Sequence, residues 1–218
     1  SYEIDTLRLL TVAFGMYGSN SKNYGDGFTT MYGANHEDIA YSYRNGNHGD
    51  GSWYSINGNI DYQRTSRKNK QRMITFSYKI NTQPQTSNSN TGYEDIHAKE
   101  EVDDLVKRLL LKNSQSDGKT NTMEQTFQVD YTTPIGELHT VEAGAKYIFR
   151  RNTSDNKLYE AAGGSDDYLY NEDRSSDYRH LNHILAAYLG YTLKYKDFTF
   201  KPGVRYEPVS YTHLTLPT

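Results

Sequence analysis

The chain has 218 residues, a net charge of −3, 35% hydrophobic residues and a mean hydropathy of −0.88. No apolar run is long enough for a transmembrane helix, which needs about 20 residues, and the weak net charge gives no reason to expect a nucleic-acid partner. The chain has 21 tyrosines and no cysteine, which argues against disorder and excludes disulfides and thiolate metal sites.

The chain opens with a short segment, 1–6, that we expect to be the tail of a turn. Alternating apolar and polar side chains predict a first strand over 7–19, because successive side chains leave a strand on opposite sides. The next stretch, 20–51, is rich in Gly, Asn, Ser and Asp and is expected to be a long loop. Within it, 28–32 and 39–43 are expected to form a small hairpin.

The clearest pattern is a hairpin with arms 52–64 and 72–82, in which apolar and polar residues alternate strictly. The basic connection 65–71 is short, so the arms are expected to pair antiparallel. A second long polar stretch, 83–121, follows. It contains a helix candidate, 100–112, whose apolar residues have helical spacing and whose charges match the helix dipole.

The same alternation predicts further strands in the second half of the chain, namely 123–133, 139–152, 178–195 and 198–207. Their connections again differ in length. They are a short turn at 134–138, a long polar stretch at 153–177 and a tight turn at 196–197.

Two regularities point to one architecture. Connections alternate between short and long, and each strand has one apolar, tyrosine-rich face and one face with charges and amides. An outer-membrane barrel has both features, with short periplasmic turns, long extracellular loops, lipid on one face and a wet or plugged lumen on the other. We therefore predict an all-β fold, an antiparallel transmembrane β-barrel of about seven long strands, with a loop helix packed on its rim. Because single-chain barrels have an even number of strands, we expect an incomplete barrel.

This architecture assigns side chains to faces. The predicted lipid-facing residues are Ile56, Ile60, Ile74, Phe76, Phe127, Val129, Leu189 and Leu193. The predicted lumen-facing polar residues are Asp61, Lys79, Asp130, Glu142, Lys146 and Arg205. Tyrosines near strand ends are expected in the interfacial girdles, and they are Tyr17, Tyr54, Tyr62, Tyr131, Tyr195 and Tyr206.

A soluble β-sandwich binding module is the alternative fold, since its strands also have one buried face. Its strands are usually shorter, about 5–6 residues, and loops longer than about 15 residues are uncommon in compact domains. Charges in the middle of the predicted strands, such as Lys79 and Asp130, also disfavour it.

Four stretches carry a family resemblance: SWYSINGNIDYQRTSRKNKQRMITFSYKINTQPQT, DLVKRLLLKN, DYTTPIGELHTVEAGAKYIFRRNTSDNKLYE and YNEDRSSDYRHLNHILAAYLGYTLKYK. They resemble the outer-membrane β-barrel family of the Bacteroidota, whose members look like TonB-dependent receptors. The similarity spans about residues 2–207. In complete relatives it implies a carboxypeptidase-like β domain and a plug domain with a TonB-interacting segment, both preceding the barrel.

The alternation breaks at Pro208, and the last residues, VSYTHLTLPT, resemble one translated frame of a sequencing-library adaptor. We therefore expect 1–208 to be the partial barrel domain and 209–218 to be a non-native tail. The alternative is a genuine C-terminal strand.

Metal and catalytic signatures are weak. His180 and His183 are three residues apart in a predicted strand, so they point to opposite faces and cannot chelate one ion together. The triplets at 36–38 and 48–50 are expected to be exposed loop residues. An acidic cluster is a candidate Ca²⁺ site without the spacing of a known loop, and consists of Asp166, Asp167, Asn171, Glu172 and Asp173. No triad, P-loop or dinucleotide motif is present, so we expect no enzyme, no cofactor and no metal.

The expected function is nutrient uptake across the outer membrane by a TonB-dependent-receptor-like transporter. The implied partners are outer-membrane lipid, a plug domain, the TonB energy complex and a small ligand that the sequence does not identify. A non-transporting structural or adhesive barrel is the alternative. Aromatic loop residues are expected to pack loops rather than to stack on ligand, and they are Trp53, Tyr93, Tyr159, Tyr168 and Tyr170.

Overall fold

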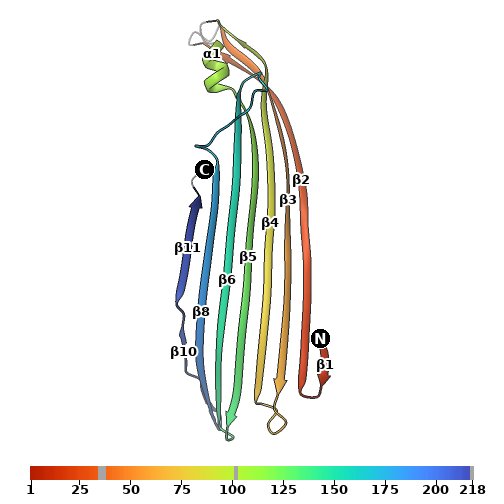
Figure 1. The fold of residues 1–218 in the computed structure, drawn as a ribbon, viewed down its shortest axis with the longest axis vertical. Helices are drawn as coiled ribbons and strands as arrows, with labels where there is room; N and C mark the ends of the chain where they lie inside the picture. The colour runs from red at the N-terminus through yellow and green to blue at the C-terminus, as the bar shows by residue number, and fades with distance from the viewer. Residues whose placement is uncertain (34–37, 101–102, 217–218) are drawn as a thin grey trace.

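The computed structural model describes residues 1–33, 38–100 and 103–216. All its strands belong to one antiparallel sheet with the order β1-β2-β3-β4-β5-β6-β8-β10, so neighbours in space are mostly neighbours in sequence (Figure 1). The sheet is open and curved, as is the wall of an incomplete β-barrel. The prediction of an antiparallel, all-β barrel wall is confirmed.

Five of the six long strands are much longer than the sequence pattern predicts, and only β8 agrees with its predicted range, 178–195. The long strands are β2 (Arg8–Tyr32), β3 (Ile39–Thr65), β4 (Met73–Ala98), β5 (Lys112–Ile135), β6 (His139–Ala162) and β8 (Ser176–Tyr195). The 27 residues of β3 extend over about 90 Å at about 3.3 Å per residue. A hydrocarbon core is about 30 Å thick, so a large part of each strand extends beyond any membrane it crosses.

The predicted long loops are therefore wrong over most of their length. Strands β2 and β3 pair without a break from Arg8 opposite Arg64 to Met31 opposite Tyr41, and only the small hairpin predicted at 28–32 and 39–43 is confirmed, as their tip. Within the stretches 83–121 and 153–177, residues 83–98, 112–121 and 153–162 likewise continue strands, whereas most of 163–175 is a connection as expected. A β-ladder needs only backbone donors and acceptors, so it continues where neither face is apolar and no alternation marks it.

Both edges of the sheet differ from the prediction. Residues 1–6 are not merely the tail of a turn, because β1 (Tyr2–Asp5) pairs with the start of β2. The predicted strand 198–207 is divided into β9 (Phe198–Phe200) and β10 (Gly203–Tyr206), which both pair with β8. The break falls at Pro202, and proline is tolerated in a sheet mainly on edge strands because it lacks an N–H donor.

The residues after Pro208 continue along the same edge. β11 (Val209–Leu216) pairs with β8 from Ile184 to Asp177. Leu185 N also donates to Pro208 O at 3.2 Å. That residues 209–218 are a non-native tail stays a prediction.

The predicted loop helix is present but shorter. It consists of α1 (Asp103–Leu105) and a π-helical turn, η1 (Val106–Leu110), while Val102 lies outside the described residues. Val106 is buried with 1% of its surface exposed, whereas Leu105 is exposed rather than packed. Gly163 N donates to Lys107 O at 2.9 Å and ties the helix to the rim of the sheet. No helix of the described residues is long and apolar enough to cross a membrane.

The register confirms the grouping of the predicted residues by face. Residues directly opposite in antiparallel strands share a face, and one continuous row crosses the sheet through Val12, Ile60, Tyr78, Phe127, Tyr147 and Leu185. Every predicted lipid-facing residue lies on this apolar face, and every predicted lumen-facing residue lies on the opposite, polar face. That the two faces contact lipid and lumen stays a prediction.

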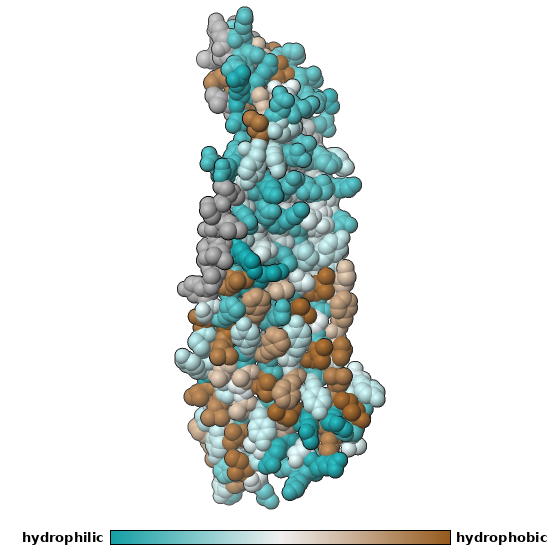
Figure 2. Space-filling model, in the orientation of Figure 1, coloured by the Kyte–Doolittle hydropathy of each residue, from teal (hydrophilic) through white to brown (hydrophobic). Residues whose placement is uncertain are grey.

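The apolar face is uncovered. Its hydrophobic residues are limited to the end of the sheet with short turns, and we call this part of the face the apolar band. In Figure 2 hydrophobic side chains gather over the lower part of the molecule, and the upper part is mostly hydrophilic, with a few hydrophobic residues near its tip. Phe14 is 74% exposed, and the buried hydrophobic residues are only Val106, Leu111, Ala161 and Ala186 among those described. A sandwich requires a second sheet over this face, so the sandwich alternative is wrong.

The tyrosines expected in the girdles divide between the faces. Most of them lie on the apolar face, as Tyr62 does opposite Phe76. Tyr17 instead lies on the polar face, where its ring meets that of Trp53 edge-on at 5.7 Å. Tyr17 is therefore placed to line the polar side rather than a lipid interface.

Adjacent positions on β4 allow a direct test of the lipid assignment. We expect Phe76→Lys to destabilise the full-length barrel in lipid vesicles by about 2–4 kcal/mol, because a charge near the bilayer midplane is costly. Ser77→Lys lies on the other face, opposite Asp61, and should cost much less. Urea titration of the two variants in vesicles measures both values, and equal losses would contradict the assignment.

Candidate functional site: the polar face and the pocket at its rim

The polar face is held by charge pairs between neighbouring strands. Arg150 donates to Glu124 Oε2 from Nη2 at 2.5 Å and from Nε at 2.9 Å, across β5 and β6. Lys201 Nζ lies 3.0 Å from Glu142 Oε2. Lys201 and Glu142 lie on opposite sides of β8, so this ion pair spans that strand. These pairs are half-exposed, so their contribution is small individually, but they fix which charges remain available on this face.

Two of the predicted acidic residues on this face, Asp61 and Asp130, are held by amides of the same strand. Asn59 Nδ2 donates to Asp61 Oδ2 at 2.7 Å, and Gln128 Nε2 donates to Asp130 Oδ2 at 2.8 Å. Each pair is separated by two residues, the spacing that puts both side chains on one face of a strand. Arg205 in turn pairs with Glu207 on the open edge. The carboxylates of Asp61 and Asp130 are thus oriented without being neutralised by a cation.

Two lysines in the middle of the polar face, Lys79 and Lys146, have no ion pair among the described residues. Lys79 and Lys146 line a concavity of about 440 Å³ together with Glu124, Gln128 and several asparagines. It lies midway along the polar face, in the rows that run opposite the apolar band. Two unpaired ammonium groups in a polar hollow are suited to bind an anionic group, either of a ligand or of another domain.

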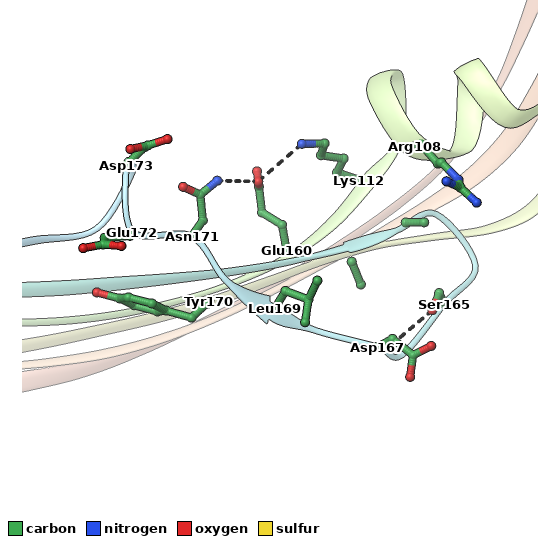
Figure 3. Close-up of a pocket in the computed structure, with 12 residues that line it drawn as sticks. Arg108, Lys112, Glu160, Ser165, Asp167, Leu169, Tyr170, Asn171, Glu172 and Asp173 are labelled. Carbon is green, nitrogen blue, oxygen red and sulfur yellow. Dashed lines mark hydrogen bonds and ion pairs between the residues drawn. The ribbon is translucent and has the colours of Figure 1, made fainter. Parts of the chain in front are cut away.

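A larger pocket of about 840 Å³ lies at the far end of the sheet, between the helix, β6, β7 (Leu169–Tyr170) and the connection to β8 (Figure 3). Glu160 lies at its centre, and only 11% of its side chain is exposed. Its carboxylate accepts from Asn171 Nδ2 at 2.7 Å and from Arg174 Nη1 at 2.5 Å, and Lys112 Nζ lies 3.5 Å away. Glu160 therefore clamps the connection 163–175 onto β5 and β6.

The surroundings of Glu160 favour its ionised form. The hydrogen bond from Asn171 lowers the pKa of the Glu160 carboxyl most, desolvation opposes this, and the charges of Lys112 and Arg174 lower the pKa further. Because the folded-state pKa is lowered, the stabilisation by this clamp is complete above the ordinary value of 4.5. It is lost as the pH falls through the lower, folded-state pKa.

The candidate Ca²⁺ cluster does not assemble into a site. In Figure 3 Asp167 lies beside Ser165 at the opposite end of the pocket from Asp173. Asn171 uses its amide on Glu160. Among the described residues no group of three or more His, Asp or Glu side chains is arranged to hold a metal ion.

The histidines follow their strands. The register places His180 and His183 on opposite faces, as predicted, and His183 Nδ1 lies 2.7 Å from Tyr147 Oη. His48 lies 4.0 Å from Asp50 on an exposed stretch of β3. His36 and Glu37 of the other triplet lie outside the described residues.

The aromatic residues expected to pack loops mostly lie in ring pairs. Tyr93 meets Tyr43 edge-on at 5.4 Å, and Tyr159 meets Tyr170 at 5.5 Å. The pairing of β6 with the short β7 brings the second pair together. Tyr168 is half-buried, and burial raises its pKa.

Glu160 and Arg150 were not predicted as site residues. Arg150 has a detectable signal, because the short turn at 134–138 sets the register that puts Glu124 opposite it. No sequence signal identifies Glu160 as a site residue. Its partners Lys112 and Arg174 lie in segments whose positions depend on all the contacts at the rim of the sheet.

The clamp can be tested by hydrogen exchange. We expect Glu160→Gln to raise amide exchange in 163–175 about tenfold near neutral pH, because charged hydrogen bonds contribute about 1.5–3 kcal/mol. Glu172→Gln in the same segment is the control, since its side chain has no partner among the described residues. The wild-type protein should approach the Glu160→Gln rates only in acid well below pH 4.5. Equal exchange in both variants would contradict the clamp.

The comparison with protein-family models agrees with this architecture. A family model described as the outer membrane protein beta-barrel family matches residues 65–216. No curated protein matches the chain. The fold is similar to the crystal structure of the ferric citrate transporter FecA in the unliganded form, with a TM-score of 0.33 and 12% identity. That match covers 96% of this chain and 39% of the other, so the chain spans well under half of that transporter. The chain belongs to the outer membrane protein beta-barrel family, and its location is the outer membrane.

Proposed function

We propose that the chain is part of the barrel wall of a TonB-dependent-receptor-like transporter in a bacterium of the Bacteroidota. The observation that carries the proposal is the charged hollow on the polar face, opposite the apolar band, where Lys79 and Lys146 have no ion pair among the described residues. A barrel that served only as an anchor would have no need of unpaired cations at this depth. A transporter uses such groups to hold a removable plug or to bind a passing solute.

In this mechanism the polar face performs two tasks. While the pore is closed, carboxylates of a plug domain would pair with Lys79 and Lys146 and keep water-filled space to a minimum. When the TonB energy complex displaces the plug, the same lysines and the oriented Asp61 and Asp130 would offer a polar path to the small ligand. The protein groups supply binding and orientation only, so we propose a role without enzymatic chemistry and without a cofactor.

A structural or adhesive role is the second candidate, and the height of the strands favours it. Residues 39–53 of β3 extend beyond the apolar band that begins near Tyr54. The described part of the wall thus offers a large polar surface outside the membrane. Such a surface suits contact with other cells or with a matrix, and it would require no ligand path.

The two roles predict different phenotypes. In cells lacking the gene, mass spectrometry of the medium measures the depletion of vitamins, ferric chelates and oligosaccharides. We expect depletion of at least one solute to be lost with the gene, and to be lost in wild-type cells treated with a protonophore. A deletion that changes adhesion to surfaces but the depletion of no solute would overturn the transport proposal.

The lysines provide the residue-level test. We expect the double variant Lys79→Glu and Lys146→Glu to lower the uptake rate of that solute more than about tenfold, because like charges now face plug or ligand carboxylates. Barrel abundance in the outer membrane should be unchanged. Lys22→Glu and Lys157→Glu, on exposed strand segments outside the hollow, form the control pair, and a similar loss in both pairs would contradict the proposed path.

A further inference from the structure

A second hollow lies on the opposite side of the wall, above the apolar band. Its volume is about 420 Å³, and it crosses strands β2, β3 and β4 where they have left the membrane zone. A smaller hollow of about 160 Å³ adjoins it and shares His48 and Asn90. The two form one groove across the strands, and we refer to it as the outward groove.

The floor of the outward groove consists of glycine. Gly46 and Gly92 are direct partners across β3 and β4, and they lie on the side that carries the apolar rows further down. A Cβ added to either glycine would meet no atom within 4 Å. No neighbouring atom therefore requires glycine at these two positions. Because neither residue has a side chain, open space is left between the rows of side chains on either side.

One wall of the groove is aromatic. Tyr24 and His48 are partners across β2 and β3, with ring centroids 4.5 Å apart and planes inclined at 57°. Tyr24 is 70% exposed, although a ring of this size costs free energy when it is left in water. The His48 ring restricts the rotamers of Tyr24, so that its open ring face is available to a ligand.

The other wall and the two ends carry planar polar groups. Arg44 and Glu94 are partners across β3 and β4, and Asp26 extends the floor row onto β2. None of these three side chains has a hydrogen bond or ion pair among the described residues. In the smaller hollow Asn88 Nδ2 donates to Asp50 Oδ2 at 3.2 Å. These groups combine hydrogen-bond donors and acceptors. They can therefore bind hydroxyl groups, each of which both donates and accepts a hydrogen bond.

The charge balance excludes an anionic ligand. Asp26, Asp50 and Glu94 outnumber the single guanidinium of Arg44, so a phosphate or a carboxylate would be repelled. An apolar ligand would leave the unpaired polar groups desolvated at a cost. A neutral polyhydroxyl compound with one C–H-rich face fits both the aromatic wall and the polar wall.

We propose that the outward groove binds a neutral saccharide, with a sugar ring against Tyr24 and its hydroxyls toward Arg44, Asn90 and Glu94. Such a sugar belongs either to a glycolipid of the outer leaflet or to a free oligosaccharide. The groove lies on the opposite face from the proposed transport path, so it is independent of the uptake proposal. It would hold the extended strands in a layer of surface carbohydrate.

The glycine floor allows a test that leaves folding intact. Gly46→Thr and Gly92→Thr each place a strand-favouring side chain in the open groove. Gly25→Thr is the matched control, because only the backbone of Gly25 borders the groove, and a Cβ there, which also meets no atom within 4 Å, points to the polar face. Tyr24→Ala removes the stacking surface.

Two arms separate the sources of the sugar. Full-length protein in detergent is titrated with maltoheptaose, mannopentaose and xylohexaose by isothermal calorimetry. The same protein in phosphatidylethanolamine nanodiscs, with and without smooth lipopolysaccharide, is followed by hydrogen exchange at 44–48 and 90–94. Binding in the first arm identifies a free oligosaccharide, and protection only in the second identifies a membrane glycolipid.

In the arm that responds, we expect Gly46→Thr and Gly92→Thr to abolish the signal and Tyr24→Ala to weaken affinity about tenfold. Gly25→Thr should bind as the wild type does. A response in neither arm would overturn the proposal, and so would equal losses in Gly25→Thr and Gly46→Thr.

Discussion

The hydrogen-bonded ladder between neighbouring strands is the constraint on which the whole structure depends. A strand that crosses lipid must satisfy every backbone donor and acceptor with a neighbour, because no water replaces a missing partner. The ladder from β2 to β8 is continuous through most of the apolar band, and the pairing of β3 with β4 omits Tyr54 and Ser55 at the upper end of the band, near Pro84, which has no N–H to donate. Its other irregularities lie further from the short turns or on the open edge, as at Met31 near the tip and at Pro202 beside β8.

The ladder also fixes the chemistry of both faces. A slip by one residue would exchange apolar and polar side chains along an entire strand, so single register-setting contacts have large effects. Glu124 with Arg150 is one of them. Another is Gly144, where an added Cβ would lie 2.3 Å from the ring of Tyr188 and 2.8 Å from Asp130. That glycine lets the Tyr188 ring lie flat on the polar face between two strands.

The alternation of apolar and polar residues predicts the strands where one face of the sheet is apolar and the other is polar. It predicts little of the fold outside that region. Ile60, Phe76 and Phe127 alternate with polar neighbours because one side of the sheet is apolar, and the strand assignments there are confirmed. Over 20–27 and 44–51 both sides of the paired strands are mainly polar, so no alternation marks them, and the expected loop there is continuous strand. The Glu160 clamp could not be predicted either, since no local pattern records a contact between β6 and its own connection.

The upper half of the wall poses a different energetic problem from the lower half. Below, lipid would cover the apolar rows. Above, the strands have almost no buried apolar surface, and the exceptions among the described residues are Val106 in the helical turn, Leu111 and Ala161. Stability there depends on the ladder and on local ties such as Glu160 with Asn171 and Arg174. In such a wall the strands resist a slip in register, but both faces of the upper half stay open to solvent. Because the two open faces differ in chemistry, one sheet can have two separate binding roles.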